Sequence, residues 1–303
     1  MKYLYPTYYK RFRCIAAACP DSCCQGWDVV IDSDTEAFYN TVQGDFGEKL
    51  REAIYTDHDG DRVFHLAKQK KCPFWGDDRL CDIFRELGEE HLCATCAQFP
   101  RITMDYTTFT EYTLALACPE AARLILTAEN AYADFADTDF AECEDYSAET
   151  MRLLLDTRVR AAQIITDDLP LSERLAALSR FAEEVQKELT GSVPASDGFS
   201  PDVWDELEYI DESDRTRITR AALTEPDCSQ YEKELTHLAL YLLYRYWLGA
   251  IDSCDVIAPT RFLIASVRIV ANLAKESGDL TAAAQLYSKE IEQSYENMEK
   301  LFF

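Results

Sequence analysis

Glycine is scarce in this chain of 303 residues, which contains only ten. No G-x-x-x-x-G-K-[ST] segment occurs, so the chain lacks a P-loop for nucleotide phosphates. No G-x-G-x-x-G follows an expected strand, which argues against a Rossmann cofactor domain. The G-x-S-x-G segment of α/β-hydrolases is absent, and so is the C-x3-C-x2-C spacing of the usual radical-SAM cluster. These absences remove several common classes of enzyme.

Positive charge is also in short supply. Lysine and arginine together number 30, against 55 aspartates and glutamates, and the formal net charge is −25. Such a surface repels phosphate backbones, so nucleic acid is excluded as a partner on electrostatic grounds. The acidity either keeps the chain soluble or attracts a lysine-bearing protein.

Long apolar runs are missing as well. The first fourteen residues, "MKYLYPTYYKRFRC", contain no apolar stretch suited to a signal peptide. The most apolar late stretch, residues 237–251, carries Arg245 and is too short to span a bilayer comfortably. We therefore expect a cytoplasmic protein without a membrane partner, and the sequence leaves its oligomeric state open.

Cysteine, by contrast, is abundant, with twelve residues. In a reducing compartment, so many thiols favour metal binding or redox chemistry over a disulfide framework. Nine of the twelve lie between Cys14 and Cys118. We predict two regions from this asymmetry: a cysteine-rich metal- or cluster-binding region, residues 1–130, and an α-helical region, residues 131–303, packed as one unit.

The predicted fold class is mainly α. The cysteine-rich part has short irregular elements, including a turn at Asp59-Gly60 and a possible short strand in "WDVVID", residues 27–32. The later part shows apolar residues at helical spacing and predicts a bundle-like set of helices. These expected helices cover 147–168, 170–191, 229–252, 259–277 and 280–301, with Gly191 as a stop and Asp279 or Thr281 as a cap.

The thiols fall into two groups. The first has the spacing C-x4-C-x3-C-C, and the second spreads over residues 72–96. Thiolates are soft ligands that select zinc or iron–sulfur clusters, and four complete a typical shell. The spacing does not choose between these metals. The adjacent pair, Cys23 and Cys24, would serve one centre only through a turn, and otherwise the two reach different centres or one supports the other.

Several segments in order resemble the bacterial flagellin lysine-N-methylases. "YLYPTYYKRFRCIAAACPDSCCQGWDVVID" is similar to the N-terminal segment of that family, and "CPFWGDDRLCDIFRELGEEHLCATCAQFPR" to its second. "LACPEAARLIL" resembles a third segment, and residues 241–270 with 287–301 resemble the C-terminal helices. The cysteine part also resembles metal-chelating proteins with a C-x2-C-x3-C-C signature, although the first gap here is four residues.

This resemblance implies methyl transfer from S-adenosylmethionine to lysine side chains of flagellin, in a protein that carries an iron–sulfur cluster, expected to be 4Fe-4S, with zinc as the alternative. Cys93 stands where the family has a small polar residue and is left out of the implied ligand set. That set is Cys14, Cys19, Cys23, Cys24, Cys72, Cys81, Cys96 and Cys118. The resemblance identifies no catalytic or S-adenosylmethionine-binding residue.

Lysine methylation requires a neutral amine, and aromatic rings hold cationic amines or sulfoniums by cation–π contact. The aromatic residues near the cysteines serve either this purpose or core packing: Tyr5, Tyr8, Tyr9, Trp27 and Trp75. Two other functions stay open: a non-enzymatic iron- or zinc-binding protein, and a helical interaction protein held together by structural zinc.

Overall fold

The structure is a computed structural model that describes residues 2–302, except 67–69, 136–137, 139 and 195–197. Its chain forms two compact units. Residues 13–102 form one, which we call the thiol unit. Residues 1–12 and 103–303 form the other, which we call the helical unit. The predicted ranges 1–130 and 131–303 do not coincide with these units, because both ends of the first range pack with the helices.

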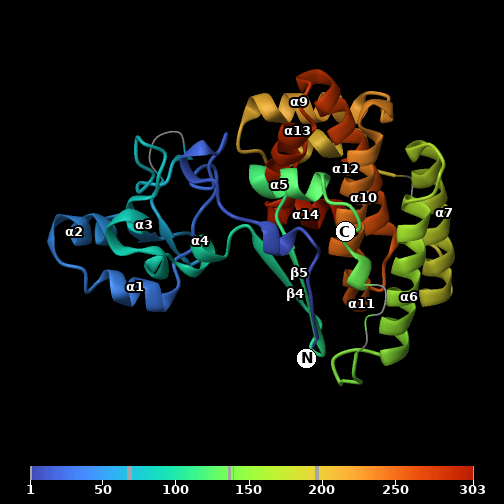
Figure 1. The fold of residues 1–303 in the computed structure, drawn as a ribbon, viewed down its shortest axis with the longest axis horizontal. Helices are drawn as coiled ribbons and strands as arrows, with labels where there is room; N and C mark the ends of the chain where they lie inside the picture. The colour runs from blue at the N-terminus through green and yellow to red at the C-terminus, as the bar shows by residue number, and fades with distance from the viewer. Residues whose placement is uncertain (1, 67–69, 136–137, 139, 195–197, 303) are drawn as a thin grey trace. The chain divides into compact units, whose positions relative to one another are not determined.

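Helices dominate the helical unit, as the mainly α prediction requires (Figure 1). Helix α9 was not predicted, and the helix expected over 280–301 is divided by a π-helical turn, η8. The elements are η1 (Tyr9–Arg11), α5 (Pro119–Leu126), η5 (Ala133–Phe135), α6 (Ala148–Ile165), α7 (Leu171–Thr190), α8 (Val203–Glu206), α9 (Glu212–Leu223), η6 (Ser229–Tyr231), α10 (Glu232–Tyr246), η7 (Trp247–Gly249), α11 (Ala250–Ser253), α12 (Ile257–Ser277), α13 (Leu280–Tyr287), η8 (Ser288–Glu292) and α14 (Tyr295–Phe302).

Capping residues fix several of these boundaries. Asp279 accepts a hydrogen bond from the N–H of Ala282 at 3.0 Å and so starts α13. Of the two expected caps, Asp279 is therefore the one used. Gly191 ends α7 with a φ of +79°, a left-handed conformation that glycine adopts without steric cost.

A three-stranded sheet belongs to the same fold. Its order is β1 (Lys2–Leu4), β5 (Phe109–Leu114), β4 (Arg101–Asp105), and β1 runs parallel to β5 with Tyr3 opposite Thr110. Every residue of β5 is buried except Tyr112, which is half-buried. Since neighbouring strand residues face opposite sides, Glu111 and Thr113 point into the core and Tyr112 points away from it.

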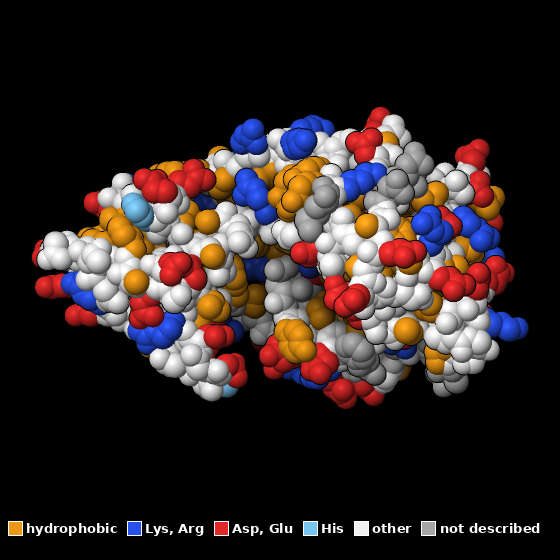
Figure 2. Space-filling view, turned by 90° about the horizontal axis from the view of Figure 1, so that it is seen from below, with side chains coloured by type: hydrophobic (Ala, Val, Ile, Leu, Met, Phe, Trp, Pro, Cys, Tyr) orange, Lys and Arg blue, Asp and Glu red, His pale blue; other side chains and the backbone are white. Residues whose placement is uncertain are grey.

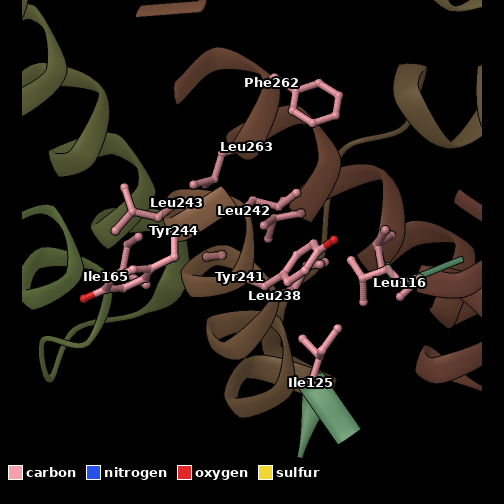
Figure 3. Close-up of a cluster of buried hydrophobic side chains, with 14 of the residues drawn as sticks. Leu116, Ile125, Ile165, Leu238, Tyr241, Leu242, Leu243, Tyr244, Phe262 and Leu263 are labelled. Atoms are coloured by element: carbon pink, nitrogen blue, oxygen red, sulfur yellow. The ribbon is translucent and has the colours of Figure 1, made fainter. Parts of the chain in front are cut away.

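The core of the helical unit forms around α10. Figure 3 shows side chains of α10 between Ile165 of α6 and Leu116, which precedes α5. Helix α12 is long and apolar enough to cross a membrane, but 72% of that stretch is buried inside the protein. A single apolar helix buried to this extent is weak evidence for a membrane span.

The thiol unit consists of short elements around a smaller core (blue to cyan in Figure 1). The predicted turn at Asp59-Gly60 joins two short antiparallel strands, whereas residues 27–32 form only an isolated bridge through Val30 to Val63. The elements are η2 (Ala16–Ala18), α1 (Ser33–Tyr39), α2 (Gly44–Glu52), β2 (Ile54–Thr56), β3 (Arg62–Phe64), α3 (Asp82–Leu87), η4 (Glu89–His91) and α4 (Ala94–Gln98).

Candidate metal centre

Cysteines are concentrated in the thiol unit, which contains eight of the twelve. All twelve are free thiols. The four in the helical unit are Cys118, Cys143, Cys228 and Cys254. The eight in the thiol unit are Cys14, Cys19, Cys23, Cys24, Cys72, Cys81, Cys93 and Cys96.

Backbone pairing brings the two cysteine groups of the sequence together. The N–H of Cys72 donates to the carbonyl of Cys24 at 2.8 Å, and Gln25 and Lys71 form an antiparallel bridge. The N–H of Gly26 then donates to the carbonyl of Lys70 at 2.9 Å. Gly26 has a φ of +99°, so glycine suits this close approach of two loops. The second group therefore meets the first by main-chain hydrogen bonds.

Two short helices position the remaining thiols. Cys81 occupies the N-cap position of α3, and Cys93 occupies the N-cap position of α4, which also contains Cys96. The carboxylate of Asp32 accepts the N–H of Ala94 at 2.8 Å and so anchors the start of α4. This hydrogen bond is also the main cause of the lowered pKa of Asp32.

The smaller core of the thiol unit, which we call the second core, lies against these thiols. Cys72 and Cys93 are buried members of this core, 7% and 1% exposed. Cys24, Cys81 and Cys96 are partly buried and pack against it. Two thiols thus belong to one small apolar cluster, and three more pack against it.

The buried thiols disfavour each other's ionisation. A hydrogen bond with Cys23 and burial together raise the pKa of Cys24, and charge on Cys72 or Cys81 would raise it further. Burial raises the pKa of Cys72 to about 12, although the N–H of Phe74 acts in the opposite direction. A bound cation would instead lower these pKa values, since a coordinating thiol is deprotonated by the metal.

Cys93, which the sequence interpretation set aside, belongs to this group. It shares a hydrogen bond with Cys96 that lowers the pKa of Cys93 and raises that of Cys96. Charges on Cys24 and Cys72 also act on Cys96. The C-x-x-C spacing of these two residues is common among metal ligands, so a signal for Cys93 was present in the sequence.

The structure places Cys14 and Cys19 at a more exposed part of the thiol unit and Cys118 in the helical unit. Burial raises the pKa of Cys19, with contributions from Cys14 and Cys23, so these three are neighbours at the more exposed side of the unit. Cys118 occupies the N-cap position of α5 and packs against the core of the helical unit. It is not part of the thiol group that residues 13–102 form by themselves.

His65, His91 and Trp27 of the thiol unit pack against aromatic rings, whereas His58 is exposed and lies 3.2 Å from the carboxylate of Asp59. The His91 ring stacks on Phe38 with centroids 4.0 Å apart, and His65 meets Tyr55 edge-on at 5.4 Å. Trp27 packs against Phe99. His65 and His91 accordingly have aromatic partners, which agrees with a packing role.

The donor chemistry fits a soft metal, although the thiols do not converge on one point. Across the described ranges, no three Cys, His, Asp or Glu side chains are arranged to hold a metal ion. Six thiols nevertheless act on one another electrostatically, a donor set that suits zinc or an iron–sulfur cluster. These six are Cys23, Cys24, Cys72, Cys81, Cys93 and Cys96.

The adjacent pair offers a test of this arrangement. Cys24 packs against the second core, and its carbonyl accepts a hydrogen bond from the N–H of Cys72, whereas Cys23 is exposed. We expect Cys24→Ser to weaken metal affinity by roughly 100-fold or more and Cys23→Ser to weaken it less. Metal content after competition with a chelator measures both, and Cys254→Ser in the helical unit is the control. If neither change alters metal content, the centre lies elsewhere.

Comparison with known proteins shows that part of the chain is similar to lysine-N-methylases of Salmonella. The chain is 33% identical over 136 residues to a lysine-N-methylase of Salmonella typhimurium, a match that covers 42% of this chain and 33% of that protein. A lysine-N-methylase of Salmonella choleraesuis is 32% identical over a match of the same length. The match therefore spans about a third of the length of these two relatives. No family model matches the chain, and no solved structure matches it.

A shorter relative is matched along most of its length. The flagellar biosynthetic protein FliU of Salmonella muenchen is 32% identical over 136 residues, and the match covers 79% of that protein. A relationship of this extent, together with the matches to the two methylases, establishes the family. The chain belongs to the flagellin lysine-N-methylase family.

Proposed function

We propose that this protein methylates lysine side chains of flagellin, with S-adenosylmethionine as methyl donor and an iron–sulfur cluster held by the thiol unit. Family membership is the observation that carries the proposed activity. The eight thiols gathered in residues 13–102 support the proposed cluster. We also propose that the protein acts in the cytoplasm, where lysine residues of flagellin are accessible before export and thiols stay reduced.

The reaction places three demands on the protein. It must bind the ammonium group of a lysine, assist the loss of its proton, and align the nitrogen with the methyl carbon. S-adenosylmethionine would supply an activated methyl group. An acidic surface suits the first demand, because it attracts cationic segments of a protein substrate.

The thiols that would hold a cluster are those packed on the second core. Charge on Cys72 or Cys81 would act on Cys24, and Cys93 or Cys96 completes a set of four. Such a cluster would add a further link between segments that are far apart in the sequence and that meet through main-chain hydrogen bonds and a small apolar core. Zinc is the alternative for the same donors.

One cavity of the helical unit has a lining whose charge opposes the methyl donor. It has a volume of about 590 Å³ and lies between α7 and α12. Its lining includes the guanidinium groups of Arg180, Arg261 and Arg268 but only one carboxylate, Glu183. S-adenosylmethionine carries a sulfonium, an ammonium and one carboxylate, so its net charge is positive and this positive lining opposes it. We therefore do not place the donor there.

Methyl transfer to flagellin tests the proposed activity. Anaerobically purified protein is incubated with flagellin and S-adenosylmethionine carrying a labelled methyl group, and peptides are analysed for labelled lysine. We expect label on lysine, abolished or reduced at least roughly tenfold in Cys72→Ser and retained in Cys254→Ser. Iron, sulfide and zinc are assayed on the same preparations.

The outcomes separate the two candidate functions. Protein that contains its full metal complement but transfers no label would refute the methylase proposal and favour a non-enzymatic metal-binding protein. Label transfer by a colourless protein that contains only zinc would keep the activity and refute the iron–sulfur cluster.

A further inference from the structure

An aromatic cluster lies at the edge of the sheet in the helical unit. The rings of Tyr5 and Tyr112 are stacked, with centroids 4.6 Å apart and planes at 12°. Tyr9 contacts both rings, at 5.3 Å from Tyr5 and 5.6 Å from Tyr112, and Tyr3 lies 6.2 Å from Tyr112. We call Tyr3, Tyr5, Tyr9 and Tyr112 the tyrosine cluster.

Core packing accounts for only part of this cluster, since Tyr9 also packs against the core of the helical unit. Tyr3 is 52% exposed, and the other three rings are half-buried. The neighbouring Tyr8 shows the contrast: it is fully buried, and its hydroxyl contacts Thr113 at 2.7 Å and Tyr132 at 2.9 Å. The turn after β1 thus sends Tyr8 inward and leaves the cluster at the surface.

A lysine already rests on the cluster. The ammonium nitrogen of Lys10 lies 5.0 Å from the centre of the Tyr5 ring, within the range of a cation–π interaction. Lys10 is itself exposed and belongs to the short turn η1, next to Tyr9. The cluster is therefore accessible to an ammonium group at the end of a flexible side chain.

The net charge of the whole chain favours the approach of cations, although the basic residues Lys2, Lys10 and Arg11 adjoin the cluster in the sequence. Asp105 of β4 is close enough to act electrostatically on the hydroxyl of Tyr112. The chain as a whole carries a net charge of −25, and Figure 2 shows acidic side chains spread over one face of the molecule. Such a field raises the local concentration of cationic segments and increases their rate of association.

We propose that the tyrosine cluster is a docking site for a lysine side chain of the protein substrate, with Lys10 as its internal occupant in the free protein. This inference rests on the proposed lysine methylation and names the surface that receives the lysine. Added methyl groups keep the positive charge and increase the apolar contact, so the cluster also accepts methylated lysine. A single ring offers less contact area to an ammonium group than the cluster does. Trp75 is such a case: its ring centre lies 5.0 Å from the ammonium nitrogen of Lys71, and no second ring contacts it within the described residues.

Binding of small lysine analogues tests the site without any methyl transfer. The probe is Nα-acetyl-Nε-trimethyl-lysine amide, the uncharged control is Nα-acetyl-norleucine amide, and ring-labelled tyrosine gives an NMR readout. We expect the cationic probe to shift tyrosine signals and the norleucine analogue to leave them unchanged. Equal binding of the two analogues would overturn the proposal.

Substitutions locate the binding to the cluster. Tyr5→Leu and Tyr112→Leu should each weaken probe binding about tenfold, whereas Tyr5→Phe and Tyr112→Phe keep the ring face and should stay within about twofold of the parent. The matched control is Tyr295→Leu, which removes a tyrosine that is 78% exposed in the same unit. Lys10→Gln removes the internal occupant and should strengthen binding several-fold. A loss in Tyr295→Leu equal to that in Tyr5→Leu, or no gain in Lys10→Gln, would contradict the site.

Kinetics distinguish this proposal from the proposed function. If the parent methylates flagellin, Tyr112→Leu should raise the KM for flagellin about tenfold and change kcat by less than about twofold, with Tyr112→Phe restoring KM. Probe binding without methyl transfer would keep the docking site and refute the activity. Methyl transfer with an unchanged KM in Tyr112→Leu would keep the activity and refute the docking site.

Discussion

Replacing Arg158 with methionine should lower the free energy of unfolding of the helical unit by about 3–5 kcal/mol. Arg158 of α6 and Glu111 of β5 form a bidentate ion pair at 2.6 and 2.8 Å, and their side chains are 1% and 0% exposed. The substitution leaves the carboxylate of Glu111 buried without its partner. The cost is therefore that of an uncompensated charge rather than of a lost contact.

Aromatic rings complete the surroundings of this ion pair. The guanidinium of Arg158 lies 4.6 Å from the centre of the Tyr244 ring and 5.8 Å from that of Phe135. The pair thus connects β5, α6 and α10 at one buried point. Because Tyr112 adjoins Glu111 on β5, the same ion pair fixes the strand that carries one member of the tyrosine cluster, Tyr112.

Urea unfolding followed by far-UV circular dichroism measures the effect. The matched control is Arg123→Met, which breaks a surface pair between Arg123 and Glu120 at 2.6 Å and should cost less than about 1 kcal/mol. The double variant Glu111→Leu/Arg158→Met removes both charges and should recover most of the loss. A double variant as unstable as the sum of its single substitutions would show that the pair does not act as a unit.

The sequence predicted the helical unit well wherever local signals were strong. Helices α6, α7 and α12 have long apolar stripes, and Gly191 and Asp279 mark ends that the structure confirms. Helix α9 was missed because few of its residues are apolar, with only Ile218 and Ala221 buried. The early strands β1 and β5 pair across more than 100 residues, a contact that no local pattern reveals.

The thiol group shows the same division between local and distant information. The cysteine spacing predicted a composite metal site, which stays a prediction, and a backbone hydrogen bond from Cys72 to Cys24 brings the two cysteine groups together. Cys93 belongs to the second core, and Cys118 belongs to the helical unit. Both placements depend on how distant segments pack, which the spacing of cysteines does not reveal. For the tyrosine cluster, the sequence offered Tyr5 and Tyr9 as candidates, but Tyr112 joins them only through the parallel pairing of β1 and β5.

Removing bound metal should unfold the thiol unit while the helical unit persists. We propose that the six interacting thiols of the thiol unit hold a metal. Structural metal sites contribute on the order of 10 kcal/mol to folding. The thiol unit has little else to stabilise it, since α1, α2, α3 and α4 are only five to nine residues long. Isolated helices of this length are marginal in water.

Hydrogen exchange measured by mass spectrometry resolves the two units. After anaerobic treatment with a chelator, amides in residues 13–66 and 70–102 should lose protection, and those in α6, α7, α10 and α12 should keep it. Cys72→Ser should reproduce this pattern without a chelator, because Cys72 is buried in the second core, whereas the exposed Cys254→Ser should not.

The contrary result is equally informative about the thiols. If the chelated protein keeps full protection throughout residues 13–102, the apolar cluster of Tyr39, Phe64 and Phe74 stabilises the unit by itself. The raised pKa values of Cys24 and Cys72 would then describe neutral thiols that pack as small apolar side chains. Loss of protection confined to this unit would instead show that ionised thiols and a cation provide the stability that its short helices lack.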